Sequence, residues 1–110
     1  MAAARKVVLI HSNFATLDDA ERVGRTLVEE GLAAAVNIQP GLVSIYAWEG
    51  RTEQVREVGM TVKTAGRLAN TVMERLTALH PYRLPAILVL PVVDCTPDYC
   101  AWIERHTGAR

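Results

Sequence analysis

The sequence predicts a small α+β domain of the ferredoxin-like class, in which one antiparallel sheet carries two long helices on one face. Strand-like and helix-like segments follow the order β-α-β-β-α-β and end in a further short helix, which is the split βαβ arrangement. The chain has 110 residues, the size of one ordinary domain. We therefore interpret residues 1–110 as a single domain with a C-terminal helix.

The first strand and the first helix are predicted within the first 31 residues. Residues 6–11 form a continuous β-branched and apolar run, typical of a central buried strand, and we expect a loop over residues 12–16. Thr16, followed closely by two aspartates, is expected to cap a helix over residues 17–30. Gly31 is a suitable residue to end it.

A long hairpin is predicted next. Residues 32–48 are mostly extended, and their apolar residues alternate with polar and aromatic ones. Pro40-Gly41 interrupts this pattern, and because proline cannot donate to a strand ladder, we expect a bulge or an edge position there. A turn over residues 49–51 leads to a second alternating strand over residues 54–63, which should pair with the first.

The C-terminal half is predicted to contain a second helix, a strand and a third helix. Thr64 is expected to cap the second helix, and Pro81 ends it. Residues 87–93 form another apolar strand, and Thr96-Pro97 starts the third helix. The apolar stripe of the second helix is Leu68, Val72, Leu76 and Leu79, and the expected inward-facing residues of the third are Tyr99, Trp102 and Ile103.

Composition excludes several classes of partner. Twelve basic residues balance twelve acidic ones, which argues against nucleic acid and against a polybasic membrane contact. No run approaches the ~18–20 apolar residues of a membrane helix, and the apolar stretch near the start is too short for a signal-peptide core. We expect no nucleic-acid partner, no membrane partner and a cytoplasmic location.

The chemistry-bearing residues do not predict an enzyme. The sequence contains neither a glycine-rich phosphate loop nor a nucleophile with a base and an orienting acid at a recognisable spacing. Its two cysteines, Cys95 and Cys100, lack the two-residue gap of a redox or zinc motif. We interpret them as free thiols near a short helix.

Three motifs carry a family resemblance: PGLVSIYAWEG over residues 40–50, the strand from Glu57 to Lys63-Thr64, and LHPYRLP over residues 79–85. In this order they resemble the CutA divalent-cation tolerance family, and the similarity extends from about Val7 to Glu104. The resemblance implies the ferredoxin-like fold, tight homotrimers built through the long strands and a design similar to PII signalling proteins. It also implies a link to divalent metals, copper above all.

Three departures from the family pattern weaken a copper site. Ala35 stands where the family often has a cysteine, and a thiolate is the soft ligand that favours Cu(I). Pro85 is followed by Ala86, where the family often has a glutamate. A second cysteine, found in some members near the end of the first strand, is also missing, with Ile10 and His11 in that region.

Histidines are the candidate metal ligands, since imidazole suits copper and zinc. His80 closes the second helix, where its alternative role is to cap the helix C-terminus. His11 lies at the carboxyl end of the first strand, with an ordinary strand-end residue as the alternative.

A second candidate site lies on the strand face that carries aromatic and charged residues. Its residues, Tyr46, Glu57, Lys63 and Tyr82, are predicted to line a cleft between subunits. The alternative for the aromatic residues is packing in the trimer interface, and the alternative for Glu57 and Lys63 is a pair across the subunit boundary.

Three functions remain in competition. The first is a trimeric metal-responsive protein that binds copper or another divalent cation weakly. The second is a PII-like sensor that binds a small anionic ligand in the inter-subunit cleft. The third is a structural trimer that holds another, unidentified protein.

Overall fold

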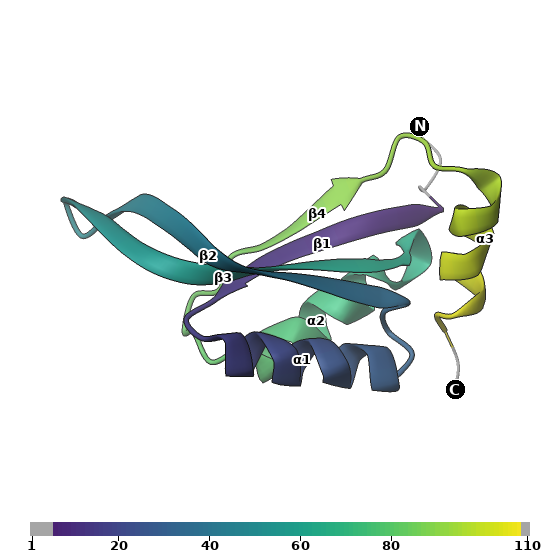
Figure 1. Cartoon of the computed structure of the whole chain (residues 1–110), viewed down its shortest axis with the longest axis horizontal. Coiled ribbons are helices and arrows are strands. Elements are labelled where there is room, and N and C mark those ends of the chain that lie inside the picture. The colour runs from purple at the N-terminus through teal and green to yellow at the C-terminus, as the bar shows by residue number, and fades with distance from the viewer. Residues whose placement is uncertain (1–5, 109–110) are drawn as a thin grey trace.

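The computed structural model describes residues 6–108, and its strands form one antiparallel sheet in the order β2-β3-β1-β4. Figure 1 shows α1 and α2 together under one face of this sheet, with α3 at one end. The elements are β1 (Val7–Phe14), α1 (Leu17–Glu29), β2 (Ala35–Trp48), β3 (Arg51–Ala65), a short 3₁₀ turn (Gly66–Leu68), α2 (Ala69–Leu79), β4 (Ile87–Pro91) and α3 (Pro97–Arg105). This order and topology confirm the predicted ferredoxin-like class.

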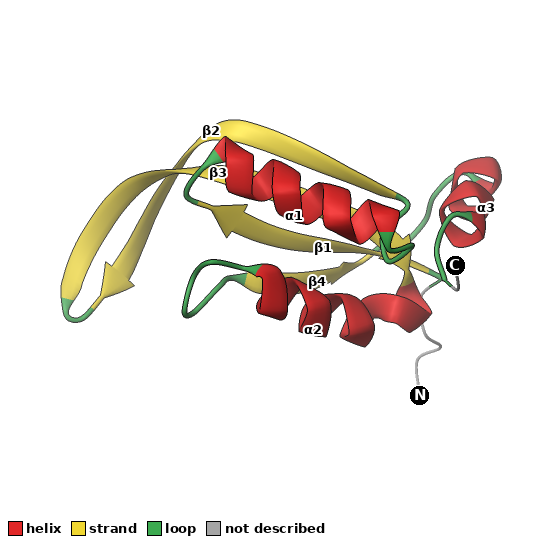
Figure 2. Ribbon diagram, turned by 90° about the horizontal axis from the view of Figure 1, so that it is seen from below, coloured by secondary structure: helices red, strands yellow, loops and turns green. Residues whose placement is uncertain are grey.

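The sheet has one face covered by helices and one open face. Val36, Val62, Ile10 and Val89 lie opposite one another across the four strands, and residues directly opposite share a face. Ile10 and Val62 are fully buried under the helices. Figure 2, seen from the helix side, shows α1 and α2 lying along this face. The core residues include Phe14, Val23, Leu27, Met60, Val72 and Leu76.

The outer half of the β2–β3 hairpin forms an arm that projects from the body (Figure 1). Strand β1 pairs with β3 only as far as Phe14 opposite Val58, so residues 42–57 pair with one another alone. The arm ends in a two-residue turn in which Glu49 and Gly50 have φ values of 49° and 78°. Positive φ at both central positions is the type I′ geometry that matches strand twist.

The predicted interruption at Pro40-Gly41 is confirmed as a bulge. Gln39 pairs with Gly59 and Leu42 pairs with Glu57, so two residues of β2 face one residue of β3. Gly41 has a φ of 86°, a backbone conformation that costs a residue with a Cβ atom roughly 1–2 kcal/mol.

The cap predicted for the first helix is also confirmed, whereas three other local expectations are wrong. The hydroxyl of Thr16 accepts a hydrogen bond from the backbone N–H of Asp19 at 3.1 Å. The loop expected over residues 12–16 is shorter, because β1 continues to Phe14 and buries both Ser12 and Phe14 completely.

Thr64 does not cap the second helix. It lies within β3, and its hydroxyl donates to the carbonyl oxygen of Leu32 at 2.7 Å. In α3, Ile103 is buried as expected, but Tyr99 is 40% exposed because it reaches toward Lys63 rather than into the core. No helix in residues 6–108 is both long and apolar enough to cross a membrane.

We predict that Gly41→Ala lowers the free energy of unfolding by about 1–2 kcal/mol. A Cβ atom at Gly41 would meet nothing within 4 Å, so the cost arises from the backbone alone. Gly41→Asn is the matched control, because asparagine tolerates the left-handed region better. Urea denaturation measures both variants, and equal stability of Gly41→Ala and wild type would contradict the requirement for positive φ.

Candidate functional site

The two candidate metal-binding histidines are both held by Asn13, near the end of β1. The Nε2 atom of His11 lies 3.0 Å from the Oδ1 atom of Asn13. The Nε2 atom of His80 lies 2.8 Å from the carbonyl oxygen of the same residue. Asn13 therefore joins an imidazole from β1 to one from the end of α2.

Both ring nitrogens of His80 are engaged. Its Nδ1 atom accepts a hydrogen bond from the backbone N–H of Tyr82 at 3.1 Å, so Nδ1 carries no proton. Nε2 must then carry the proton and donate it to Asn13. The ring is 7% exposed and stacks on Phe14 with the centroids 4.2 Å apart. Burial lowers the pKa of His80, although Asp19 and Glu57 act in the opposite direction. His80 is thus a neutral imidazole that fastens the start of the α2–β4 connection.

Tyr82 extends this network to the base of the arm. Its hydroxyl donates to the Oε2 atom of Glu57 at 2.6 Å, a short bond typical of a charged acceptor. Burial raises the pKa of Tyr82, and the bond to Glu57 adds to the effect. Glu57 lies one residue beyond the last β3 residue that pairs with β1, so Tyr82 contacts β3 just past the end of β1.

The predicted cleft residues are brought together in part. Glu57 and Tyr82 are in contact, and Tyr46 is near enough to contribute to the raised pKa of Tyr82. Lys63 lies six positions from Glu57 along β3, a separation of roughly 20 Å. Its Nζ atom instead donates to the hydroxyl of Tyr99 at 3.0 Å. Within one subunit, Lys63 belongs to a contact with α3 and not to the Glu57–Tyr82 cluster.

His80 does not fit a metal ion in this arrangement, whereas Nδ1 of His11 makes only a long contact. An imidazole binds a metal through a ring nitrogen without a proton, and on His80 that nitrogen is occupied by the N–H of Tyr82. On His11, Nε2 donates to Asn13 and Nδ1 lies 3.5 Å from the hydroxyl of Thr61. Within residues 6–108, no three His, Cys, Asp or Glu side chains are placed to share an ion.

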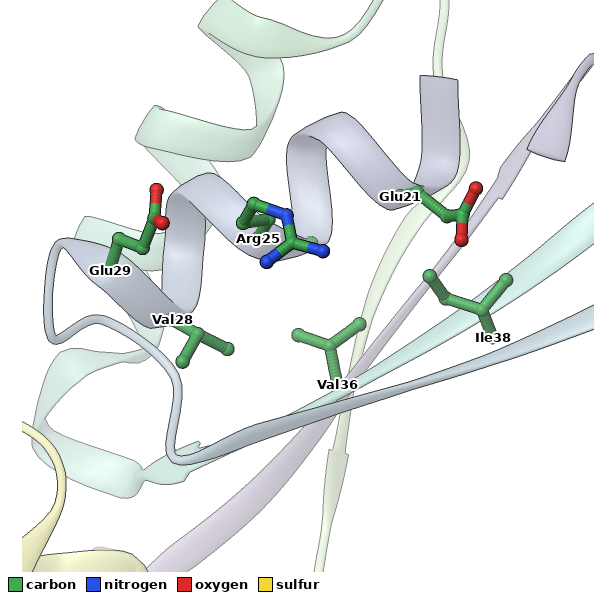
Figure 3. A pocket seen from close by; sticks show the side chains of 7 residues that line it. Glu21, Arg25, Val28, Glu29, Val36 and Ile38 are labelled. Atoms are coloured by element: carbon green, nitrogen blue, oxygen red, sulfur yellow. The ribbon is translucent and has the colours of Figure 1, made fainter. Parts of the chain in front are cut away.

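A groove of about 290 Å³ lies between α1 and the edge strand β2, away from these residues. Figure 3 shows Val36 and Ile38 of β2 along one side, and charged side chains of α1 along the other. The charged residues are Glu21, Arg25 and Glu29, spaced four apart on one side of the helix. None of the candidate residues from the sequence lines this groove.

Asn13 and Phe14 are the site residues that sequence reasoning missed. Both fall in the segment expected to be a loop, although polar and buried residues alternate there as they do in a strand. Continuing the period of two through residues 11–14 places His11 and Asn13 on the same face. That pattern was the available signal, whereas the contact between His80 and a carbonyl 67 residues away had none.

These features define a small ferredoxin-like α+β protein with a projecting hairpin arm and a polar network at the base of the arm. A model of the family described as CutA1 divalent ion tolerance protein matches residues 8–106. The chain belongs to this family.

Individual relatives match the sequence of this chain over most of their length. The chain is 43% identical to the divalent-cation tolerance protein CutA of Thermus thermophilus over 89 residues, which covers 81% of this chain and 86% of the relative. It is 36% identical to the protein of the same name from Pyrococcus horikoshii, covering 92% and 98%. The crystal structure of CutA from Xylella fastidiosa superposes with a TM-score of 0.90 at 41% identity, covering 94% and 99%.

We predict that the free energy of unfolding rises with pH across the titration range of His80. The folded state lowers the pKa of His80 below its ordinary value of about 6.5, so the unfolded state binds more protons in the window between the two values. Stability is fully present above about pH 6.5 and falls as the pH drops toward the folded-state pKa.

Urea denaturation at several pH values measures this dependence. His80→Gln should be less stable than wild type at neutral pH and should lose this part of the slope. His106→Gln is the control, because His106 is exposed at the end of α3. An unchanged slope in His80→Gln would show that His80 is not the group responsible.

Proposed function

We propose that this protein acts in divalent-cation tolerance as a homotrimer whose subunits join through the long strands, without catalysing a reaction. The observation that carries the proposal is the set of exposed large apolar side chains on the arm, in a chain that matches the CutA1 family over residues 8–106. A cytoplasmic location stays a prediction, which subcellular fractionation tests.

The exposed apolar residues support assembly. Large side chains on both faces of the arm and on the edge strand β4 are exposed in the single chain, and contiguous apolar surface marks an interaction site. Both edge strands, β2 and β4, also keep unpaired backbone groups that can pair with another chain. The most exposed of these side chains are Val43 at 52%, Ile45 at 64% and Leu88 at 60%.

Two further surfaces favour contact with a second copy of the chain: the groove between α1 and β2, and the face of the sheet that no helix covers. The groove between α1 and β2 has an apolar side formed by the edge strand itself. The open face carries three leucines beside His11, namely Leu9, Leu88 and Leu90. Contact with another subunit would remove these leucines from water, while His11 keeps a polar group on the same face. Neighbouring subunits would cover both features at once.

We predict a sedimenting mass of about three times the 12.1 kDa of one chain. Ile45→Asp should weaken the trimer without unfolding the subunit, because this side chain is already 64% exposed in the single chain. Asn70→Asp, which puts the same charge on an exposed position of α2, should leave the mass unchanged. A concentration-independent monomer for the wild type would overturn the assembly.

The metal-ion part of the proposal is that copper or another divalent cation binds weakly, with ligands shared between subunits. His11 is the better candidate, because it is half-buried on the open face where copies would meet. A metal on His80 would have to displace the N–H of Tyr82 or the contact with Asn13. The absence of a thiol at Ala35 also removes the ligand most suited to Cu(I).

We predict that calorimetric titration of metal-free protein with copper and with zinc detects weak binding that His11→Ala abolishes. His80→Ala should reduce stability more than it reduces metal affinity, because its nitrogens are used within the fold. His106→Ala is the matched control for a surface imidazole. Binding that persists unchanged in both His11→Ala and His80→Ala would rule out a site that uses either of these histidines.

A further inference from the structure

The start of α3 places the two cysteines of the chain together. Thr96 is the residue before the first helical position, so Cys95 precedes the cap and Cys100 is the fourth residue of the helix. These two positions are the pair that pack against each other in a hydrophobic staple. The backbone N–H of Cys100 donates to the carbonyl oxygen of Thr96 at 3.0 Å, which closes the first turn.

Both cysteines are half-buried and have free thiols. A hydrogen bond with the thiol of Cys100 raises the pKa of Cys95 to about 11, and burial, Asp94 and Glu104 act in the same direction. At neutral pH Cys95 therefore carries its proton. Among the described residues, no third His, Cys, Asp or Glu side chain is placed to share an ion with the two thiols.

We propose that Cys95 and Cys100 are a reversible redox pair that closes to an intramolecular disulfide at the start of α3. The oxidant is a small disulfide of the glutathione class. A thiolate of one cysteine attacks it, forms a mixed disulfide and expels one small thiolate. The second cysteine attacks the protein sulfur and expels the other. Two protein S–H bonds are oxidised, one external S–S bond is reduced, and both protons end on the released thiols.

The disulfide would act on the contact between α3 and the sheet. Tyr99, next to Cys100, accepts the hydrogen bond from Lys63 of β3 and stacks on Trp102 with ring centroids 5.6 Å apart. Closure would fix the first turn of α3 and thereby the position of Tyr99. This inference goes beyond the proposed metal-ion function and requires no metal.

Reduced full-length protein incubated with oxidised glutathione provides the test. We expect the free-thiol count to fall from two to zero per chain, with an intact mass lower by two hydrogen atoms and no retained adduct. Dithiothreitol should restore both thiols. Cys95→Ser and Cys100→Ser should each instead retain one stable glutathione adduct, because neither can complete the second step.

Three results would overturn the proposal. These are stable adducts on both cysteines of the wild type, covalent dimers on a non-reducing gel, and no reaction under conditions that oxidise a reference dithiol peptide. The wild-type mass decides the question even if a serine variant fails to fold. A failure of metal titration would leave this result unaffected, so the two proposals fail separately.

Discussion

The unequal lengths of β1 and β3 govern the rest of the structure. Strand β3 runs from Arg51 to Ala65, but β1 pairs with it only from Val58 onward. The inner half of β3 thus lies in a four-stranded sheet under two helices, where Met60 and Val62 are fully buried. The outer half has β2 as its only strand partner in the described chain, and no helix covers it (Figure 2). One strand therefore supplies both the core of the subunit and the surface available to another chain.

The polar network lies at the boundary between these halves. Where β1 stops, its last backbone carbonyls would face no strand, and buried backbone groups need partners. The Nε2–H group of His80 donates to the carbonyl oxygen of Asn13. The hydroxyl of Tyr82 donates to Glu57 on β3, one residue past the end of the β1–β3 pairing. Because Tyr82 donates its N–H to His80, the tautomer that satisfies Asn13 also holds the loop. Both ring nitrogens of His80, which the sequence suggested as a metal ligand, are therefore occupied by hydrogen bonds at the end of the sheet.

Sequence patterns were sufficient for the class of fold, because periods of two and of 3.6 residues record which face of each element is buried. They also located the bulge, since Pro40-Gly41 has a local conformational cause. Sequence patterns failed where a contact between distant segments determines the hydrogen-bond partner of a side chain. Thr64 is a good capping residue, yet a carbonyl 32 residues away takes its hydroxyl. The cleft expected from Glu57 and Lys63 lies between subunits and stays a prediction, since the two residues are roughly 20 Å apart along β3 within one subunit.

The type I′ turn at the tip also limits how the arm can vary among relatives. A two-residue connection leaves no loop in which to absorb an extra residue. A one-residue insertion in either strand would exchange the faces of all residues between it and the tip. That exchange would move Tyr46 and Trp48 to the face that now carries Val43 and Ile45. Unless a further bulge like that at Pro40-Gly41 takes up the extra residue, the arm lengthens or shortens by two residues on each strand, which changes its reach by roughly 7 Å per step.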